Sequence, residues 1–551
     1  MNWVQNYDPL SNILLSALVA AVPLYVLFYM LAVRRAKGHF AAALGTTAAV
    51  LLAILVWGMP VGLAVNATLY GAAYGLFPIV WIVITAVWIY NMTVESGEFE
   101  IIKDSLARLT DDRRLQAIFI AFAFGSFIEG TAGFGTPVAI TAAMLVGLGF
   151  NPLYAAGICL IANTAPVAFG AIGIPVIVAG QVSGLDTMHI SQIVGRQLPF
   201  LSILVPLWLC VTMCGFKRSL EVLPAVLVAG VCFAGSQYAF SNFHGPTLPD
   251  IMSAIITIIG LVLLLRVWKP ATTWHFPDET PSSVTGPSPY SFGEIIRAWM
   301  PYIILAVMVF FWGLPEIKPF LDGALGAGYT PLAAKGFAWP GLHNAIEKTT
   351  PIVAANAPYG AMFKLNIISA AGTAILFTGL AAVPMMPRYG YGQAIPCLFR
   401  TMHQLRFPIV TIAMILGLAQ IMNYSGMSST MGLAFTKTGW LFPFFSPLLG
   451  WLGVFLTGSD TSSNALFSGL QRTTATSVGM DPHLAVAANS SGGVTGKMIS
   501  PQSISVATAA TKMVGQEGQL FRFTLWHSVA MTMFICVLTM LQAYPLKWML
   551  P

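Results

Sequence analysis

The chain has 551 residues, of which 57% are hydrophobic and only 8% are charged. Ordinary soluble domains carry about 25% charged residues, so the composition excludes a soluble enzyme. Apolar residues run along the whole length, which excludes a receptor with a single membrane anchor and predicts an all-α polytopic membrane protein surrounded by lipid. The formal net charge of +6 is too slight to indicate a nucleic-acid partner.

Ten apolar runs are long enough to cross a membrane as ordinary helices. They lie near residues 10–33, 40–57, 62–91, 190–213, 220–240, 250–268, 294–313, 367–383, 403–425 and 522–546. Several are followed by basic residues, namely Arg34, Arg35, Lys37, Lys103, Arg108, Arg113, Arg114, Lys217 and Arg218. Since basic loops face the cytoplasm, both termini are predicted to be periplasmic.

Two long segments between the predicted spans are expected to lie outside the membrane. Residues 269–293 are rich in Pro and Ser and are predicted to form a flexible cytoplasmic connector. With the two spans before it, the connector makes a linking segment, residues 216–293. Residues 314–366 contain Pro and Gly but few strong apolar runs, and we expect a long external loop there.

Two further regions are apolar but crowded with Gly, Pro, Ser, Thr and Asn. Broken backbone at membrane depth is tolerated only where protein or a water-filled cavity satisfies it. We therefore interpret each region as a re-entrant hairpin followed by a broken helix. The predicted hairpins are about 115–150 and 440–480, and the predicted broken helices are about 152–182 and 482–514.

The two regions resemble each other. The segment from Asn163 to Pro175 aligns with the segment from Asn489 to Pro501, and the two match at Asn, Gly and Pro. Asn151-Pro152 precedes the first segment and Asp481-Pro482 the second. If the chain has twelve spans and two hairpins, the first hairpin enters the membrane from the cytoplasm and the second from outside. The two halves then have opposite orientations, which predicts inverted repeats at 1–215 and 294–551. Corresponding Gly/Pro-interrupted segments in such repeats indicate a transporter's binding site.

Glu129 and Asp460 are the candidate proton carriers. Each lies among small residues in an apolar region, within clusters at 129–137 and 458–464. A carboxylate at membrane depth costs roughly 2.5–3.5 kcal/mol, so each must be paired, protonated or hydrated. The alternative for Glu129 is a helix-capping acid at a hairpin tip. For Asp460, which precedes a predicted helix, an N-cap role is an equally strong alternative.

Short polar side chains and glycines surround both acids. They can hydrogen-bond a carboxylate or ligate an ion, and half-helix N-termini can hold an anion. Lys497 is the one cation in the core of either broken region, and it either contacts an anionic substrate, pairs with an acid or extends to an interface. The candidate substrate-binding residues are Gly130, Thr131, Asn163, Thr164, Ser459, Thr461, Ser462, Ser463, Asn464, Asn489, Ser490, Ser491 and Lys497.

No cofactor or metal is expected. The run from Gly492 to Lys497 is similar to a phosphate loop, but Met498 stands where Ser or Thr is needed and no strand precedes it. The eight histidines are scattered among loops and span ends. Secondary transport is therefore favoured over an enzyme or a nucleotide-driven pump.

The whole chain resembles the bacterial L-lactate permease family. The motifs that carry the resemblance are IEGTAGFGTPVAITAAMLVGLGF, IANTAPVAFGAIGIPVIVAG, LFPFFSPLLGWLGVFLTGSDTSSNALF and AANSSGGVTGKMISPQSISVA. The resemblance implies uptake of L-lactate, with D-lactate and glycolate as related substrates, by proton symport across the bacterial inner membrane. It implies neither a stereochemical preference nor an oligomeric state.

The family in turn is similar to the wider ion transporter superfamily. Dicarboxylate members of that superfamily carry Ser-Asn-Thr at two hairpin tips and move a transport domain against a scaffold by an elevator mechanism. The resemblance therefore implies a scaffold built from spans near 10–91, 190–268 and 294–425. Here Glu129-Gly130-Thr131 replaces the first Ser-Asn-Thr, which fits proton coupling better than the alternative, a sodium-coupled small-carboxylate carrier.

Overall fold

The structure is a computed structural model. It describes residues 2–34, 36–131, 133, 136–277, 288–314, 316–326, 328–353, 355–513 and 516–551. Outside the described residues lie Arg35 of the first basic loop, residues 132, 134 and 135 of the 129–137 cluster, residues 278–287 of the predicted connector, and residue 514 at the end of the second predicted broken helix. The described chain is mostly helical, as the composition predicts.

The first part of the chain forms helices joined by two π-helical turns. These elements are α1 (Ile13–Ala20), α2 (Val22–Phe28), η1 (Tyr29–Val33), α3 (Gly38–Leu55), α4 (Val61–Tyr74), η2 (Gly75–Val80), α5 (Trp81–Glu95) and α6 (Glu98–Ala107). The first interrupted region contains α7 (Arg113–Gln116), η3 (Ala117–Phe124), α8 (Gly125–Thr131), α9 (Thr136–Gly147), α10 (Pro152–Ala162), η4 (Val167–Phe169) and α11 (Gly170–Ser183). Three long helices follow, α12 (Thr187–Leu220), α13 (Leu223–Phe243) and α14 (Pro249–Val267).

The second part begins at α15 (Phe292–Gly313). Residues 314–366 contain α16 (Ile317–Gly323), α17 (Thr330–Ala334), β2 (Phe337–Ala338), β3 (Ile346–Lys348), β4 (Ala357–Pro358) and β5 (Met362–Phe363). Next come α18 (Ala371–Ala382), η5 (Val383–Met385), α19 (Tyr391–Gln404), α20 (Arg406–Ser425), α21 (Met427–Phe435) and η6 (Thr436–Leu441). The second interrupted region and the C-terminus contain α22 (Phe442–Thr457), α23 (Asp460–Val478), α24 (Pro482–Gly496), η7 (Lys497–Ile499), α25 (Pro501–Ala510), α26 (Glu517–Ala543) and η8 (Lys547–Met549).

Nine stretches of the described chain are helical, long and apolar enough to cross a membrane, and the pair α10–α11, bent by 63°, makes a tenth. Eight of the ten predicted runs are confirmed as such helices. The runs near 10–33 and 367–383 instead form the shorter apolar helices Ile13–Phe28 and Ala371–Met385. Pro23 and Pro384 lie inside these two helices, in the first turns of α2 and η5, where the missing N–H of proline is tolerated. The first of the two helices continues into the π-helical turn η1.

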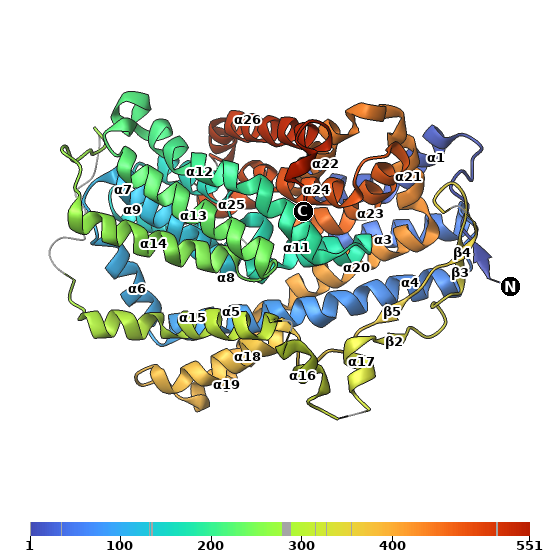
Figure 1. The fold of residues 1–551 in the computed structure, drawn as a ribbon, viewed down its shortest axis with the longest axis horizontal. Helices are drawn as coiled ribbons and strands as arrows, with labels where there is room; N and C mark the ends of the chain where they lie inside the picture. Colours follow the sequence, from blue (N-terminus) through green and yellow to red (C-terminus); the bar gives the residue numbers. More distant parts are fainter. Residues whose placement is uncertain are drawn as a thin grey trace.

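Helices from the two parts of the chain interleave. α3 and α4 pack against α20, and α5 packs against α18 and α19. α12, α13 and α14 lie side by side (Figure 1), with α12 also against α24. The buried apolar core divides into two clusters, and α12 and α13 share theirs with α9 to α11, α24 and α26. The resemblance had implied that residues 190–268 belong to the scaffold, whereas this core places α12 and α13 with the interrupted helices.

The N-terminus is fixed to the segment 314–366. The N-terminal strand β1 (Trp3–Val4) pairs in parallel with β3, which pairs antiparallel with β4. β2 and β5 form a second small sheet, and all five strands lie at the end of the molecule marked N (Figure 1). The N-terminus and the segment 314–366 therefore lie on the same side of the molecule. That this side faces the periplasm stays a prediction.

Candidate functional site

The tips of the two interrupted regions meet at one cavity. Both predicted proton carriers and Lys497 line it. The full lining is Glu129, Gly133, Val167, Gly170, Ala171, Pro175, Gly458, Ser459, Asp460, Thr461, Lys497, Gln502, Ser503 and Val506. The sequence prediction that these distant segments converge is thus supported by the geometry.

Glu129 forms a buried ion pair with Lys497. The Lys497 ammonium donates to Glu129 Oε1 at 2.8 Å, and the two side chains are 9% and 4% exposed. Of the alternatives for Lys497, the structure shows pairing with Glu129. Glu129 lies in the last turn of α8, where a negative charge opposes the helix dipole, so its alternative role as a helix-capping acid is not what the structure shows.

Glycine makes room for the Glu129 carboxylate. A Cβ atom at Gly170 would lie 2.7 Å from Glu129 Oε1, closer than real Cβ atoms approach an oxygen. The second oxygen, Oε2, is buried and has no hydrogen-bond partner among the described residues. One face of this carboxylate is therefore occupied by Lys497, and the other oxygen is available for a proton or a ligand.

Asp460 begins α23 but does not cap it. The N-cap is Ser459, whose hydroxyl accepts from the Ser462 N–H at 3.2 Å, so the N-cap interpretation of Asp460 is wrong by one residue. Asp460 Oδ2 accepts from the Ser490 hydroxyl at 2.6 Å and from the Asn464 amide at 3.3 Å. Asp460 Oδ1 is buried without a partner among the described residues, so this acid also keeps one oxygen free.

A buried polar network lies behind Asp460. The Asn464 amide also donates to the Ser490 hydroxyl at 3.1 Å, and the Asn489 amide donates to Asn464 Oδ1 at 2.9 Å. Gln471 donates to Asn489 Oδ1 at 3.1 Å. These side chains join α23 to α24. Because each of them is held by a hydrogen bond to the next, the network fixes the orientation of the Asp460 carboxylate.

Each of the two interrupted regions contacts the other near its helix break. Glu129 of the first hairpin binds Lys497 at the break between α24 and α25. Asn464 of the second hairpin donates to the Pro175 carbonyl beyond the first break at 3.2 Å. Neither contact could be read from the sequence alignment, because the alignment matches corresponding residues of the two regions and does not show which residues touch.

The first break has an unusual backbone. Ala171 and Ile172 have φ values of 44° and 60°, a left-handed conformation that a β-branched residue rarely adopts. Such strain persists where the surroundings enforce it and is concentrated at functional sites. Regular helix resumes near Pro175, and the aligned Pro501 is likewise the first residue of α25.

The remaining predicted residues divide into groups. Gly130 packs against Asp250, Thr131 donates to the Phe127 carbonyl, and Ser463 donates to the Gly450 carbonyl. Thr461 lines the cavity. The side chains that are buried without any partner among the described residues are Asn163, Thr164 and Ser491, and they do not line the cavity as it stands.

Sequence reasoning missed Asp250. This residue lies in the first turn of α14, 1% exposed, and packs against the tip of the first hairpin at Gly130. It interacts electrostatically with Glu129 and Lys497, yet neither of its oxygens has a hydrogen-bond partner among the described residues. An acid at the start of an apolar span is ordinarily a helix end at the membrane interface, so the position of Asp250 did not single it out. The one signal in the sequence was that this acid begins a span without a basic residue beside it.

A second cavity, of about 790 Å³, lies farther along α23. Lys348 and Arg472 line it, and neither makes an ion pair among the described residues. The Lys348 ammonium lies 3.7 Å from the centre of the Tyr359 ring, and Arg472 donates to the Ser183 carbonyl at 2.6 Å. Burial and the nearby Arg472 lower the pKa of Lys348 to about 8.

Comparisons with known sequences give a consistent match. The family model described as L-lactate permease matches residues 16–546. The chain is 49% identical to the L-lactate permease of Bacillus subtilis (strain 168) over 575 aligned residues, which cover all of both chains. It is 50% identical to the glycolate permease GlcA of Escherichia coli (strain K12), again over all of both chains.

Similarity to solved structures is weaker. The YdaH transporter of Alcanivorax borkumensis aligns with 88% of this chain and 89% of its own, at 14% identity and a TM-score of 0.43.

Proposed function

The chain belongs to the L-lactate permease family, and from that membership we propose that it takes up L-lactate together with a proton, with glycolate and D-lactate as related substrates. Its relatives are permeases, so it is a transporter and not an enzyme. The location that we propose is the bacterial inner membrane, with both termini periplasmic.

The observation that carries the proposal is the buried Glu129–Lys497 pair at the cavity. Three acids, Glu129, Asp460 and Asp250, are buried near a single cation, Lys497. An unpaired buried charge costs several kcal/mol, so a site with excess carboxylates favours protonation. Adding a substrate carboxylate increases that excess, and anion binding should therefore bring a proton with it.

Lys497 can neutralise one carboxylate at a time. When a substrate anion binds the Lys497 ammonium, Glu129 loses its partner, and its carboxylate is then buried without compensation unless it takes up a proton. In this scheme Glu129 is the first proton carrier, and Asp460 is the second. Competition for one ammonium couples the proton to the substrate without any direct contact between them.

The other substrate contacts follow from the same geometry. Thr461 and the backbone at the tip of the second hairpin face the cavity, and half-helix N-termini favour a carboxylate. The substrate hydroxyl would meet Asp460 or a nearby Ser or Thr. These contacts do not involve the predicted residues that do not line the cavity, which would contact substrate only after a rearrangement of the site, namely Asn163, Thr164, Asn489, Ser490 and Ser491.

We propose that the second cavity lies on the approach path of the substrate. Arg472 lies twelve residues after Asp460 on α23, a helical rise of about 18 Å. An anion attracted by Lys348 and Arg472 would then pass along α23 to the first cavity. We propose this cavity as the external vestibule.

The finer architecture also remains part of the proposal. We propose twelve spans and two re-entrant hairpins in two inverted repeats, residues 1–215 and 294–551. The two hairpins and broken helices would move together as a transport domain of the elevator type. The contacts that each hairpin makes with the other half's broken helix support such a joint movement.

Uptake of labelled L-lactate into proteoliposomes, with pH, sodium and potential imposed independently, tests the coupling. We expect uptake driven by an inward pH gradient with no sodium present. Uptake that needs a sodium gradient and ignores pH would overturn proton symport in favour of the sodium-coupled alternative.

Lys497→Met tests the substrate site in the same assay. Loss of the ammonium should raise the lactate concentration needed for half-maximal exchange by roughly tenfold or more, the equivalent of about 1.4 kcal/mol. Lys103→Met, which removes an amine from the exposed pair with Glu100, is the matched control. An unchanged lactate affinity in Lys497→Met would remove Lys497 from the site.

A further inference from the structure

Two histidines and an aspartate from distant parts of the sequence meet where α12 and α24 begin. His189 lies in the first turn of α12, Asp481 is the N-cap of α24, and His483 follows it by two residues. One ligand atom of each residue lies within 4.8 Å of the other two. In the part of the chain that the structure describes, this is the one group of three His, Cys, Asp or Glu side chains with such an arrangement.

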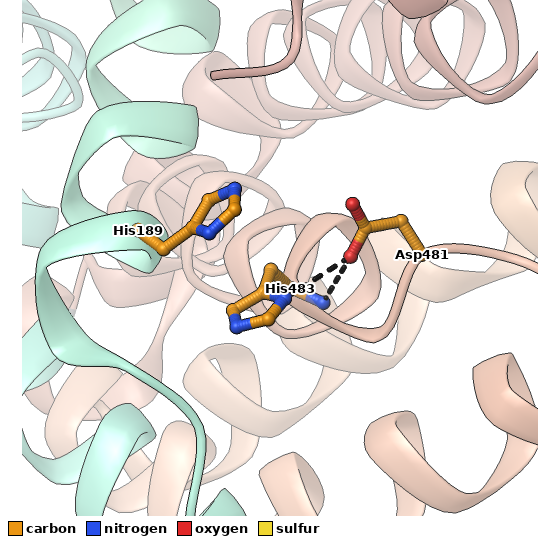
Figure 2. A group of neighbouring side chains, drawn as sticks. All are labelled: His189, Asp481 and His483. Atoms are coloured by element: carbon orange, nitrogen blue, oxygen red, sulfur yellow. Dashed lines mark hydrogen bonds and ion pairs between the residues drawn. The ribbon is translucent and has the colours of Figure 1, made fainter.

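The ligand atoms already have spacings close to those around one ion. His483 Nδ1 lies 3.2 Å from Asp481 Oδ1. Two bonds of roughly 2.0–2.1 Å that meet at a tetrahedral angle place their ligand atoms about 3.3–3.4 Å apart. The His189 ring stacks on the His483 ring with centroids 4.3 Å apart (Figure 2). Because the nitrogen lone pairs lie in the ring planes, binding of one ion by both rings requires the His189 ring to turn out of this stacked arrangement.

A polar atom without a partner also points to a ligand. His189 Nε2 is buried and has no hydrogen-bond partner among the described residues, although a buried ring nitrogen ordinarily has one. Asp481 Oδ1 accepts from the His483 N–H at 2.8 Å as the cap of α24. A carboxylate has about four lone-pair sites, so Asp481 can cap the helix and bind an ion at once.

The charge and exposure of the site suit a cation from solution. Asp186, the N-cap of α12, accepts from the His189 N–H at 2.8 Å and adds a second carboxylate beside the cluster. The His483 and Asp481 side chains are 22% and 28% exposed, which leaves room for an ion to enter and for water to complete its coordination. Two imidazoles and a carboxylate are ligands that Zn²⁺ prefers, whereas Mg²⁺ and Ca²⁺ prefer oxygen alone.

We propose that His189, Asp481 and His483 form a binding site for a divalent transition-metal ion of the zinc type. The ion joins α12 to α24, the helix that carries Asn489 and Ser490 beside the substrate cavity. The site is separate from the Glu129–Lys497 pair and does not depend on which substrate the protein carries.

The test is direct measurement of Zn²⁺ binding to the purified protein, which must carry an affinity tag other than polyhistidine. We expect one Zn²⁺ per chain and a raised unfolding temperature, with no effect of Mg²⁺ or Ca²⁺. His189→Gln and His483→Gln should each weaken binding by about tenfold or more. Asp481→Asn should do the same while keeping the helix cap, because Asn caps helices as well as Asp does.

His403→Gln, which alters a histidine on α19, is the matched control and should bind Zn²⁺ as the unaltered protein does. Unfolding of each variant without metal shows whether it is folded. Absence of stoichiometric Zn²⁺ binding, or equal binding after both His189→Gln and His483→Gln, would overturn the site. Loss confined to Asp481→Asn would also overturn it, because the ion would then be held at a surface carboxylate.

Discussion

In the proposed mechanism, proton coupling depends on the carboxylate of Glu129. Replacing it by Gln keeps the shape and a hydrogen-bond acceptor for Lys497 but removes the titratable group. We expect Glu129→Gln to reduce lactate uptake driven by a pH gradient by roughly tenfold or more, the equivalent of about 1.4 kcal/mol, and to retain exchange of labelled for unlabelled lactate. Glu98→Gln alters another buried glutamate away from the cavity and is the control. Gradient-driven uptake equal to that of the unaltered protein would remove Glu129 from the proton path.

Gly170 tests whether the position of that carboxylate matters as well as its charge. An Ala side chain there would clash with Glu129 Oε1 and push the carboxylate away from Lys497. We expect Gly170→Ala to lower transport while the protein still folds. Gly235→Ala on α13 adds the same methyl group where nothing lies within 4 Å and should leave transport unchanged. Full transport by Gly170→Ala would show that the pair tolerates displacement.

The titration of Lys348, in the segment 314–366, makes the free energy of unfolding depend on pH. Its folded-state pKa of about 8 lies below the ordinary value of 10.5, because burial and Arg472 disfavour the charged form. Between these two values the unfolded chain binds more protons than the folded chain, so the free energy of unfolding rises with pH in this window. We expect the unfolding temperature to rise between pH 8 and pH 10 relative to Lys348→Met, which lacks the titrating group. Parallel pH profiles for the two proteins would contradict this assignment, and Lys364→Met is the control in the same segment.

At the scale of elements, one buried arginine holds three loops together. Arg114 is fully buried, pairs with Asp112 and Glu221 at 2.7 Å each, and donates to the carbonyls of Arg218 and Thr272. Asp112 lies before α7, Arg218 and Glu221 lie in the last turn of α12 and directly after it, and Thr272 lies after α14. The loops that the charge pattern predicted to share the cytoplasmic side are thus in direct contact.

Arg114→Met should therefore destabilise the whole assembly. It leaves Asp112, which is 1% exposed, as a buried charge without its partner, and losing one member of a buried pair costs about 3–5 kcal/mol. We expect a clear drop in unfolding temperature in detergent. Lys103→Met breaks a solvent-exposed pair, worth about 0–1 kcal/mol, and should have little effect. Equal unfolding temperatures for both variants would show that Arg114 serves only to orient the chain in the membrane.

The sequence predicted the elements better than the contacts between them. Gly and Pro at 115–182 and 440–514 break helices for local reasons, so the interruptions between short helices in both regions could be placed from composition. The ion pair of Glu129 with Lys497 and the burial of Asp250 depend on how distant helices pack, and no local pattern encodes that. Arg114 was missed for a related reason, because its position already fitted the positive-inside rule and so gave no sign of burial.

For the whole molecule, the proposed symport of one proton with one lactate anion would make each cycle electrically neutral. The accumulation ratio of lactate should then rise about tenfold for each unit of pH gradient, which is worth about 1.4 kcal/mol. Membrane potential, worth roughly 2.3 kcal/mol per charge per 100 mV, should leave the ratio unchanged. Measuring lactate at steady state in proteoliposomes with a fixed pH gradient and varied potential checks this. A ratio that follows the potential would indicate a different stoichiometry.

The pairing of β1 with β3 also sets an order of assembly. Trp3 leaves the ribosome more than three hundred residues before its partner Ile346. At about 5–20 residues per second, the N-terminal strand waits roughly 20 to 70 s for that partner. During this interval Gln5, which finally bonds to the carbonyls of Asn423 and Tyr424, has no place to dock. The strand closes the fold late in synthesis, so a bulky fusion at the N-terminus should impede maturation more than the same fusion at the C-terminus.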